Sequence, residues 1–307
     1  MKISIILCTY NRAKSLEKAL RSLSASRMPQ EASWEVLVVD NRSKDRTADV
    51  VQEFIKEFPG RFRYQFESTP GKSFALNAGI AACVDADVLA FVDDDVEVAS
   101  DWLQKITDPL RSGLYCGAGG RILPDRQFTP PRWMDTSGRY SLAPLAIFDL
   151  GLLAGPLLEP PFGTNMCFNR EVFNQYGGFR TDLGPRPGNE IRNEDAEFGD
   201  RLLSAGEQLW YEPTAVVYHS IPAERVTKKY FLAWWFDKAR GDIRQSGVVE
   251  HAALRILGIP LFYVRRLVAW SARWFCTFEP RQRFNCQIKI WSIAGAMTEC
   301  FTGARNR

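Results

Sequence analysis

The sequence predicts an α/β protein with a mostly parallel sheet, flanked by helices and followed by a C-terminal helical extension. Three observations support this class. Short apolar runs alternate with helical periodicities over the first 100 residues. The apolar runs are continuous, as in buried parallel strands. The 307-residue chain is 46% apolar and 24% charged, which allows a large core and excludes wholesale disorder.

The elements follow one another in a β-α alternation. We expect strands at 3–7, 35–40, 62–66 and 88–92, with helices at 14–24, 47–57 and 71–83 between them. Leu16, Leu20 and Leu23 recur on one face of the first helix. The crossovers between such strands should be right-handed. If the strands are parallel, the loops after the first, second and fourth strands meet at one sheet edge.

Three acids, Asp93, Asp94 and Asp95, end the fourth strand. Adjacent carboxylates repel one another unless they share a cation, and Mg²⁺ or Mn²⁺ with oxygen ligands suits this position. The alternative is a solvated acidic turn. The pattern therefore makes this strand end the first candidate for a metal site.

The same edge should receive Thr9, Asn11 and Asp40 from the other strand ends, and Lys72 from the start of a helix. Amide donors, a lysine and a metal together suit a nucleotide diphosphate. The alternative for Lys72 is a solvated surface lysine. No Gly-x-Gly-x-x-Gly follows the first strand, which argues against a dinucleotide site.

These motifs together resemble family 2 glycosyltransferases of the GT-A fold. The motifs are Cys8-Thr9-Tyr10-Asn11-Arg12, Val39-Asp40-Asn41, Gly71-Lys72 with Asn77, and the Asp-x-Asp motif in Asp93-Asp94-Asp95. The resemblance implies that Thr9 and Asp40 contact the base, Lys72 lies near the nucleotide, Asp93 binds ribose and Asp95 holds the metal. The full predicted set for the nucleotide sugar, UDP-linked in most of the family, is Thr9, Tyr10, Asn11, Arg12, Asp40, Lys72, Asn77, Asp93, Asp94 and Asn165.

The middle of the chain should handle the acceptor. Residues 124–161 are rich in Pro, Gly and aromatics and predict a long ordered loop. Residues 162–168 predict a turn entering a strand, and the resemblance places Gly163 and Asn165 beside the donor sugar. The alternative for Gly163 is a turn that needs a small residue.

A helix should begin after Asn193, a good N-cap residue, and end at Gly206. Its first turn holds Glu194 and Asp195, and acids there commonly complement the helix dipole. The resemblance implies instead a catalytic acidic pair, with Asp195 as general base. His219 ends a final strand, where a histidine is often structural; the resemblance makes it a further metal ligand.

Residues 222–307 differ from the rest of the chain. They carry 15 Lys or Arg and 6 Asp or Glu, a net charge of +9 that leaves −6 for residues 1–221. We therefore expect a catalytic domain at 1–221 and a basic helical extension at 222–307. Arg255, Arg266 and Arg273 should share one face of a helix that starts near residue 252. This extension suits the inner surface of a membrane, or packing against the catalytic domain or a partner.

The resulting hypothesis is an inverting, metal-dependent glycosyltransferase that uses a glycan or lipid-linked acceptor in cell-surface polysaccharide synthesis. Seven scattered cysteines without zinc spacing predict reduced thiols and a cytoplasmic protein, peripheral on the inner membrane face at most. Two alternatives are a nucleotidyltransferase, whose usual Gly-rich loop is missing at 8–12, and a non-catalytic nucleotide-sugar or glycan-binding subunit. No nucleic-acid-binding motif is present.

Overall fold

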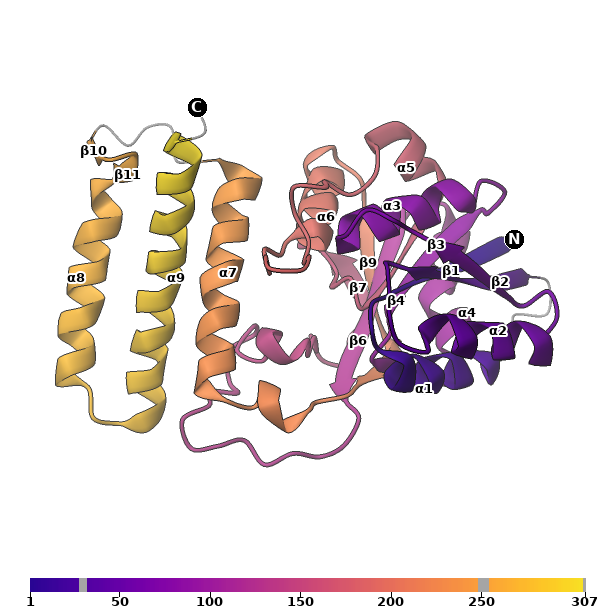
Figure 1. The fold of residues 1–307 in the computed structure, drawn as a ribbon, viewed down its shortest axis with the longest axis horizontal. Coiled ribbons are helices and arrows are strands. Elements are labelled where there is room, and N and C mark those ends of the chain that lie inside the picture. The colour runs from indigo at the N-terminus through magenta and orange to yellow at the C-terminus, as the bar shows by residue number, and fades with distance from the viewer. Residues whose placement is uncertain (28–31, 248–253, 306–307) are drawn as a thin grey trace. The chain divides into compact units, whose positions relative to one another are not determined.

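The computed structural model describes residues 1–27, 32–247 and 254–305, and the chain forms two compact units (Figure 1). The first unit comprises Met1–Arg126, Ala146–Asp182 and Glu194–Ser220. The second comprises Gln127–Leu145, Leu183–Asn193 and Ile221–Arg307. The second unit therefore includes two segments that precede residue 221.

In the described residues, the first unit contains a nine-stranded sheet of order β3-β2-β1-β4-β8-β6-β9-β5, with β7 beside β9. The strands are β1 (Lys2–Thr9), β2 (Ser33–Asp40), β3 (Phe62–Phe66), β4 (Val88–Asp93), β5 (Val96–Val98), β6 (Gly117–Pro124), β7 (Gly155–Leu157), β8 (Asn165–Asn169) and β9 (Leu209–His219). Strands β1 to β4 are parallel, as are β6 and β9, whereas β8, β5 and β7 run antiparallel to their neighbours. The predicted α/β class with a mostly parallel sheet is confirmed.

Helices cover both faces of this sheet (Figure 1). One face carries α1 (Ala13–Ser24), α2 (Thr47–Glu57) and α4 (Trp102–Thr107); the other carries α3 (Lys72–Ala82), α5 (Glu171–Tyr176) and α6 (Glu194–Ser204). A 3-10 turn, η1 (Asp108–Ser112), follows α4. The predicted stripe Leu16, Leu20 and Leu23 of α1 is buried. Helix α3 lies directly on β1, because a Cβ on Gly79 would stand 2.6 Å from the Ile6 side chain.

An aromatic cluster fixes α6 against the sheet. Phe198 of α6 stacks on Phe173 with ring centroids 4.8 Å apart and contacts Phe168 of β8 edge-on. Phe198 is fully buried, and burying such a side chain contributes about 1.5–3 kcal/mol. This packing determines where the first turn of α6, with its acids, meets the sheet.

The second unit is helical. It contains α7 (Lys228–Ser246), α8 (Leu261–Cys276) and α9 (Pro280–Arg305), a hairpin of β10 (Arg255–Ile256) and β11 (Ile259–Pro260), and the 3-10 turns η2 (Ala143–Leu145) and η3 (Ala223–Arg225). Helix α9 packs against both α7 and α8, and the three lie side by side (Figure 1). A Cβ on Gly295 of α9 would stand 2.1 Å from the Phe236 carbonyl oxygen, so α7 and α9 approach at backbone distance.

The prediction of one basic helix face was wrong for Arg255. This residue lies in β10, and α8 begins only at Leu261, directly after Pro260. Proline is favoured at a helix start, where its missing amide hydrogen costs nothing, and disfavoured in a helix interior, where it would break a hydrogen bond. Arg266 and Arg273 remain on α8, whereas residues 252 and 253 of the predicted helix lie outside the described residues.

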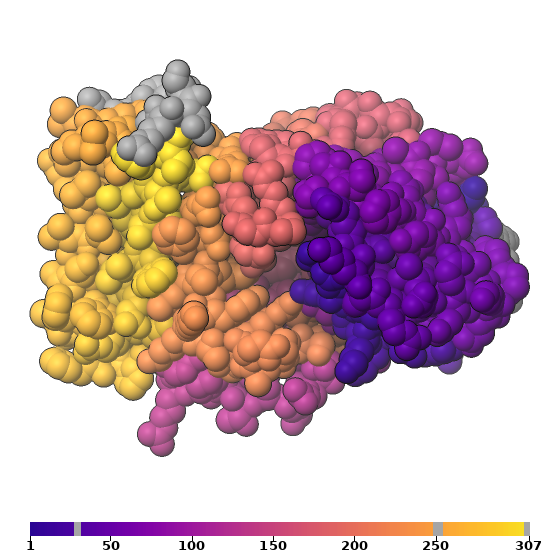
Figure 2. Space-filling view, in the orientation of Figure 1, coloured from indigo at the N-terminus to yellow at the C-terminus, as the bar shows by residue number. Residues whose placement is uncertain are grey.

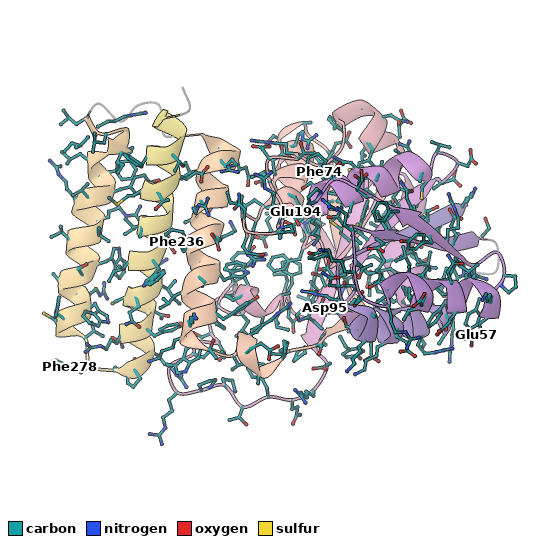
Figure 3. All side chains as sticks on the ribbon, in the orientation of Figure 1. Glu57, Phe74, Asp95, Glu194, Phe236 and Phe278 are labelled. Carbon is teal, nitrogen blue, oxygen red and sulfur yellow. The ribbon has the colours of Figure 1, made fainter. Side chains whose placement is uncertain are left out.

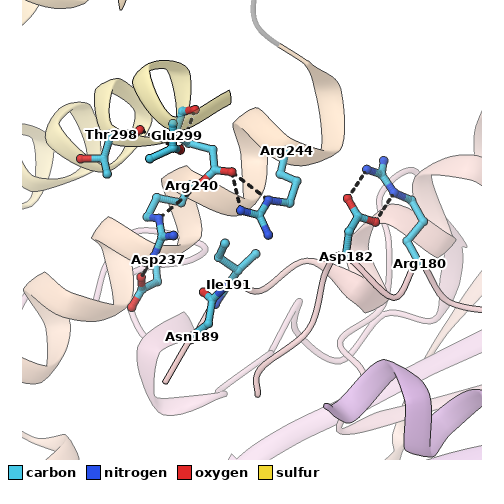
Figure 4. A network of polar contacts seen from close by, with 10 residues as sticks. Arg180, Asp182, Asn189, Ile191, Asp237, Arg240, Arg244, Thr298 and Glu299 are labelled. Carbon is cyan, nitrogen blue, oxygen red and sulfur yellow. Dashed lines mark hydrogen bonds and ion pairs between the residues drawn. The ribbon is translucent and has the colours of Figure 1, made fainter. Parts of the chain in front are cut away.

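A buried ion network joins α7 to α9 (Figure 4). Glu299 of α9 accepts hydrogen bonds from Arg240 and Arg244 of α7, and Arg240 also donates to Asp237. Glu299 is only 7% exposed. Two guanidinium groups thus face two carboxylates, and the charges of this network balance.

Across residues 1–27, 32–247 and 254–305, none of the helices combines the length and apolar character needed to cross a bilayer.

Candidate active site

The carboxyl ends of the parallel strands place the predicted residues at one edge of the sheet. Thr9 of β1 pairs with Asp40 of β2, and Cys8 of β1 pairs with Asp93 of β4. Adjacent strands lie about 4.8 Å apart, so Asp40 and Asp93 are separated by about 10 Å across β1. The edge formed by the ends of β1, β2 and β4 is therefore wide enough for a nucleotide, and each of these strands places a polar group there.

Asp94 is held by groups from β1 and the turn after it. Thr9 Oγ1 donates to Asp94 Oδ2 at 2.7 Å, and Arg12 Nη1 lies 2.9 Å from Asp94 Oδ1 and 3.0 Å from Asp95 Oδ2. Asp94 is buried. Burial raises the pKa of Asp94 to about 6 and repulsion from Asp95 adds to it, while Arg12 opposes the rise.

Lys72 joins the strand-end acids to helix α6. Its Nζ lies 3.0 Å from Asp93 Oδ1 and 3.4 Å from Glu194 Oε1, and Thr164 Oγ1 donates to Asp93 Oδ2 at 2.7 Å. Burial opposes the lysine charge, but the surrounding carboxylates raise the pKa of Lys72 well above its usual value. The same lysine outweighs burial at Asp93 and lowers the pKa of that carboxyl. Lys72 is therefore an ion-paired cation and not a solvated one.

The position of Lys72 depends on the chain just before it. Gly71 has φ +138°, a left-handed region that favours glycine. Its amide donates to Asn41 Oδ1 at 2.7 Å, and Asn41 Nδ2 donates to the carbonyls of Glu67 and Thr69. Asn41 thus orders the loop that leads into α3.

Glu194 and Asp195 occupy the first turn of α6, and Glu194 is labelled with Asp95 in Figure 3. Burial and repulsion from Asp195 raise the pKa of Glu194 against the effect of Lys72. Asp195 Oδ2 accepts a 2.7 Å hydrogen bond from the Gly163 amide, and Oδ1 accepts one from Ala196. A Cβ on Gly163 would stand 3.0 Å from Asp195 Oδ2. The glycine therefore gives the carboxylate both a donor and the space to reach it.

Asn193 does not cap α6 as the sequence predicted. Its Nδ2 donates to Asp242 and Gln245 of α7, and its Oδ1 accepts no hydrogen bond from the described residues. The side chain is drawn to partners about 50 residues later in the chain, which a local capping rule does not consider.

Asp95 and His219 meet because β5 pairs with β9. Val96 lies opposite His219 in this antiparallel pair, and Asp95 Oδ1 is 3.4 Å from His219 Nε2. Neighbouring ligands of an octahedral ion with bonds near 2.1 Å lie about 3 Å apart, so this oxygen and nitrogen fit two sites on one Mg²⁺ or Mn²⁺. Within the described ranges, no three acidic, histidine or cysteine side chains form a complete metal cage. A pair of protein ligands is typical where substrate phosphates supply the others.

Two predicted residues have their amide groups occupied inside the protein. Asn165 is fully buried, donates to the carbonyls of Arg121 and Ala215, and accepts from Trp102 Nε1. Asn77 pairs both its amide atoms with the main chain of Phe179. The structure groups neither side chain with the strand-end acids, and each of them orders the chain near the site.

The remaining predicted residues line the loops after β1 and β2. Asp40 is buried and accepts hydrogen bonds from the Ser43 amide and the Tyr64 hydroxyl. Asn11, at φ +52°, accepts from the Lys44 amide, which joins the two loops. Tyr10 is 44% exposed at the same turn.

Two contacts of this edge involve residues that the sequence did not single out, namely Thr164 on Asp93 and Tyr64 on Asp40. A third contact joins Asn41 to Gly71, two residues that belong to the recognised motifs but were given no role of their own. Thr164 lies between Gly163 and Asn165, in a segment already expected near the donor. Its place in that segment is therefore a signal from which it could have been predicted as a site residue. Tyr64 lies inside β3, and its sequence context carries no such indication.

The chain is similar to known proteins in sequence and in fold. Residues 4–177 match the family described as glycosyl transferase family 2. The succinoglycan biosynthesis protein ExoM of Rhizobium meliloti is 30% identical over 238 residues, which cover 76% of this chain and 70% of that protein. The glucosyl-dolichyl phosphate glucuronosyltransferase of Haloferax volcanii is 26% identical over 228 residues, covering 72% of this chain and 70% of that one.

Solved structures share the fold. The mannosyltransferase PcManGT from Pyrobaculum calidifontis, in complex with GDP-Man and Mn²⁺, superposes with a TM-score of 0.58 at 18% identity, over 99% of this chain and 75% of that one. GalNAc-T7 with UDP, GalNAc and Mn²⁺ gives a TM-score of 0.57 at 17% identity, over 81% and 51% of the two chains. The family match, the similarity to ExoM and the GT-A architecture together establish that this chain is a member of glycosyltransferase family 2.

Proposed function

We propose that the protein transfers a sugar from a nucleotide diphosphate sugar to a hydroxyl of a glycan or lipid-linked acceptor, with inversion at the anomeric carbon. The observation that carries this proposal is the linked set of Asp93, Lys72 and Glu194, with Asp195 held by Gly163 beside it. It brings a phosphate-compatible cation, ribose-compatible acids and an oriented carboxylate to one edge of the sheet.

Asp195 is the general base in this proposal. The Gly163 and Ala196 amides orient its carboxylate, whose remaining lone pairs can accept the acceptor hydroxyl proton. A positioned base contributes about 10²–10⁴-fold to such a step. Because one base and one face of attack suffice for an in-line displacement, the product should have inverted configuration.

Asp95 and His219 would hold Mg²⁺ or Mn²⁺ together with the donor diphosphate. When bound, the ion neutralises charge on the departing diphosphate. Lys72 and Arg12 add fixed positive charge at the same edge. In this proposal Asp40 and Thr9 contact the base, Asp93 binds the ribose, and the nucleotide is UDP.

The names of the similar proteins support the acceptor class. ExoM is a succinoglycan biosynthesis protein, and the Haloferax volcanii enzyme acts on a glucosyl-dolichyl phosphate. We therefore place this chain in cell-surface polysaccharide or glycan synthesis, at the cytoplasmic side of the membrane.

The test is a panel of nucleotide sugars assayed for hydrolysis and transfer, with Mn²⁺, with Mg²⁺ and with a chelator. We expect turnover of one UDP-sugar, dependent on the divalent cation, and an inverted product by proton NMR of the anomeric centre. Binding without turnover would support a non-catalytic subunit, and release of pyrophosphate from a nucleoside triphosphate and a sugar phosphate would support a nucleotidyltransferase. Either result contradicts the proposal.

We also propose that the second unit contacts an anionic membrane surface. Helix α8 belongs to the amber-coloured part of the chain in Figure 2. It exposes Val268 (65%) and Phe275 (69%), which lie seven residues or about two helical turns apart, and Arg265 is exposed on the same helix. An apolar stripe flanked by arginines is typical of interfacial helices. Flotation with anionic liposomes that weakens in the double variant Val268→Ser/Phe275→Ser is the expected result, and no flotation of the intact protein excludes the contact.

A further inference from the structure

The second unit contains a cavity that the proposed chemistry does not use. Its volume is about 770 Å³, within the range of small-molecule sites. Helices α7, α8 and α9 and the segment 134–141 form its walls. All of these elements belong to the same compact unit.

Apolar and aromatic side chains form the base of the cavity. Met134, Phe231, Phe284 and Ile293 line it and are each at most 4% exposed. The partly buried Trp270 of α8 also lines the cavity and packs against the cluster that contains Ile293. A surface of this composition favours a hydrocarbon chain over a freely hydrated solute.

Three positively charged side chains also line this cavity. Arg266 and Arg273 of α8, seven residues apart on one helix face, and Lys289 of α9 line it. In the described part of the chain none of these three forms a salt bridge with a carboxylate. Arg273 instead lies over the Trp270 ring at 5.2 Å, which holds its guanidinium on the wall.

The two acids that line the cavity already have other partners. Asp242 pairs with Lys238 and accepts from Asn193. Asp135 accepts from the Ser137 amide and hydroxyl and from Asn285. The three cations therefore present uncompensated positive charge beside an apolar floor.

We propose that this cavity binds a phosphate group carried on a long hydrocarbon chain. Guanidinium groups bind phosphate through paired charge-assisted hydrogen bonds, and the aromatic floor takes the adjoining part of the chain. This inference rests on the proposed function to the extent that a lipid-linked acceptor would carry such a group. It assigns the recognition of the lipid anchor to the helical unit, separately from the sheet edge.

The experiment measures binding of farnesyl phosphate to the full-length protein, below its critical micelle concentration, by quenching of tryptophan fluorescence and by calorimetry. Farnesol tests the chain alone and inorganic phosphate tests the anion alone. We expect one saturable site, with farnesyl phosphate bound at least tenfold more tightly than either comparator.

The double variant Arg266→Gln/Arg273→Gln should weaken farnesyl phosphate binding at least tenfold. Arg265→Gln is the matched control, since Arg265 is exposed on α8 but does not line the cavity, and it should stay within twofold. Because all three arginines are exposed, the fold should persist, which circular dichroism checks.

Several outcomes would overturn the inference. These are equal affinity for farnesol, equal affinity for inorganic phosphate, an equal loss in Arg265→Gln, or binding of anionic vesicles without binding of soluble farnesyl phosphate. Asp195→Asn should bind farnesyl phosphate normally. Failure of this binding with intact sugar transfer would reject the cavity assignment alone, and normal binding without any transfer activity would reject the proposed function.

Discussion

A charged network at the sheet edge of the first unit and another between two helices of the second unit differ in their charge balance. At the sheet edge, Lys72 and Arg12 face Asp93, Asp94, Asp95, Glu194 and Asp195. In the helical unit, Arg240 and Arg244 face Asp237 and Glu299. Two cations against five carboxylates leave a surplus of negative charge in the first unit, whereas the second network is neutral (Figure 4).

This difference separates a structural network from a ligand site. A balanced network is complete when the protein has folded, and it joins two helices. Buried charges without enough partners cost several kcal/mol each, so a surplus is maintained where a ligand compensates it. By this reasoning the surplus of carboxylates at the sheet edge supports the proposed external cation, whereas Arg266 and Arg273 at the cavity of the second unit are exposed and can receive an anion without requiring one.

The largest effect should come from the carboxylate that carries out the chemistry. Asp195→Asn retains the shape and keeps the Gly163 contact through its one carbonyl oxygen, but it loses the Ala196 contact and cannot take a proton, so turnover should fall about 10²–10⁴-fold. The donor Kd should change less than threefold. Steady-state transfer kinetics and calorimetric titration with the donor measure both. Asp200→Asn, on the exposed side of α6, is the control; unchanged turnover in Asp195→Asn would reject its role as base.

The second-largest effect should come from a change that directly tests the surplus of negative charge at the sheet edge. Asp95→Asn removes the negative charge of one of two proposed metal ligands, and we expect turnover to fall about 100-fold because the ion is held less tightly and the diphosphate charge is less well neutralised. The Mn²⁺ concentration for half-maximal activity should rise as well. Asp101→Asn, outside the site, serves for comparison. Equal Mn²⁺ dependence in both variants would place the metal elsewhere.

Lys72→Met should lower the free energy of unfolding by about 3 kcal/mol, because it leaves Asp93 and the buried Glu194 without their shared cation. Urea unfolding without divalent cations measures the change, and added Mn²⁺ should restore part of it. Lys56→Met, an exposed position on α2, should cost less than about 0.5 kcal/mol. Equal losses of unfolding free energy in Lys72→Met and Lys56→Met would mean that the sheet edge carries no surplus of negative charge.

Arg244→Met should have the smallest of these effects, about 2 kcal/mol by urea unfolding, since Glu299 keeps Arg240 as a partner. Activity per folded molecule should remain unchanged. Arg281→Met, exposed on α9, is the matched variant. A loss greater than that of Lys72→Met would reverse the proposed contrast between the two networks.

Local patterns were sufficient to predict the first half of the sheet. The stripe of α1, the acids ending β4 and the glycine before α3 each depend on a few neighbouring residues. The strand ends then followed from parallel topology alone.

Long-range partners explain what the sequence did not predict. Asn77 pairs with Phe179, 102 residues away, and Asn165 with Ala215, 50 residues away. Asn193 turns toward α7 for the same reason. Asparagine offers two donors and two acceptors, so its role depends on which backbone groups the fold brings near it. Periodicity and spacing contain no such information.

The pairing of β5 with β9 has a consequence for assembly. His219 reaches Asp95 only when a strand contributed 124 residues later has docked in register, and a slip of one residue would turn its imidazole to the opposite face of the sheet. Ion affinity and closure of this edge should therefore be thermodynamically linked. A chelator would then loosen the last strand first, and protection of its amides from hydrogen exchange would report occupancy of the metal site without any sugar being transferred.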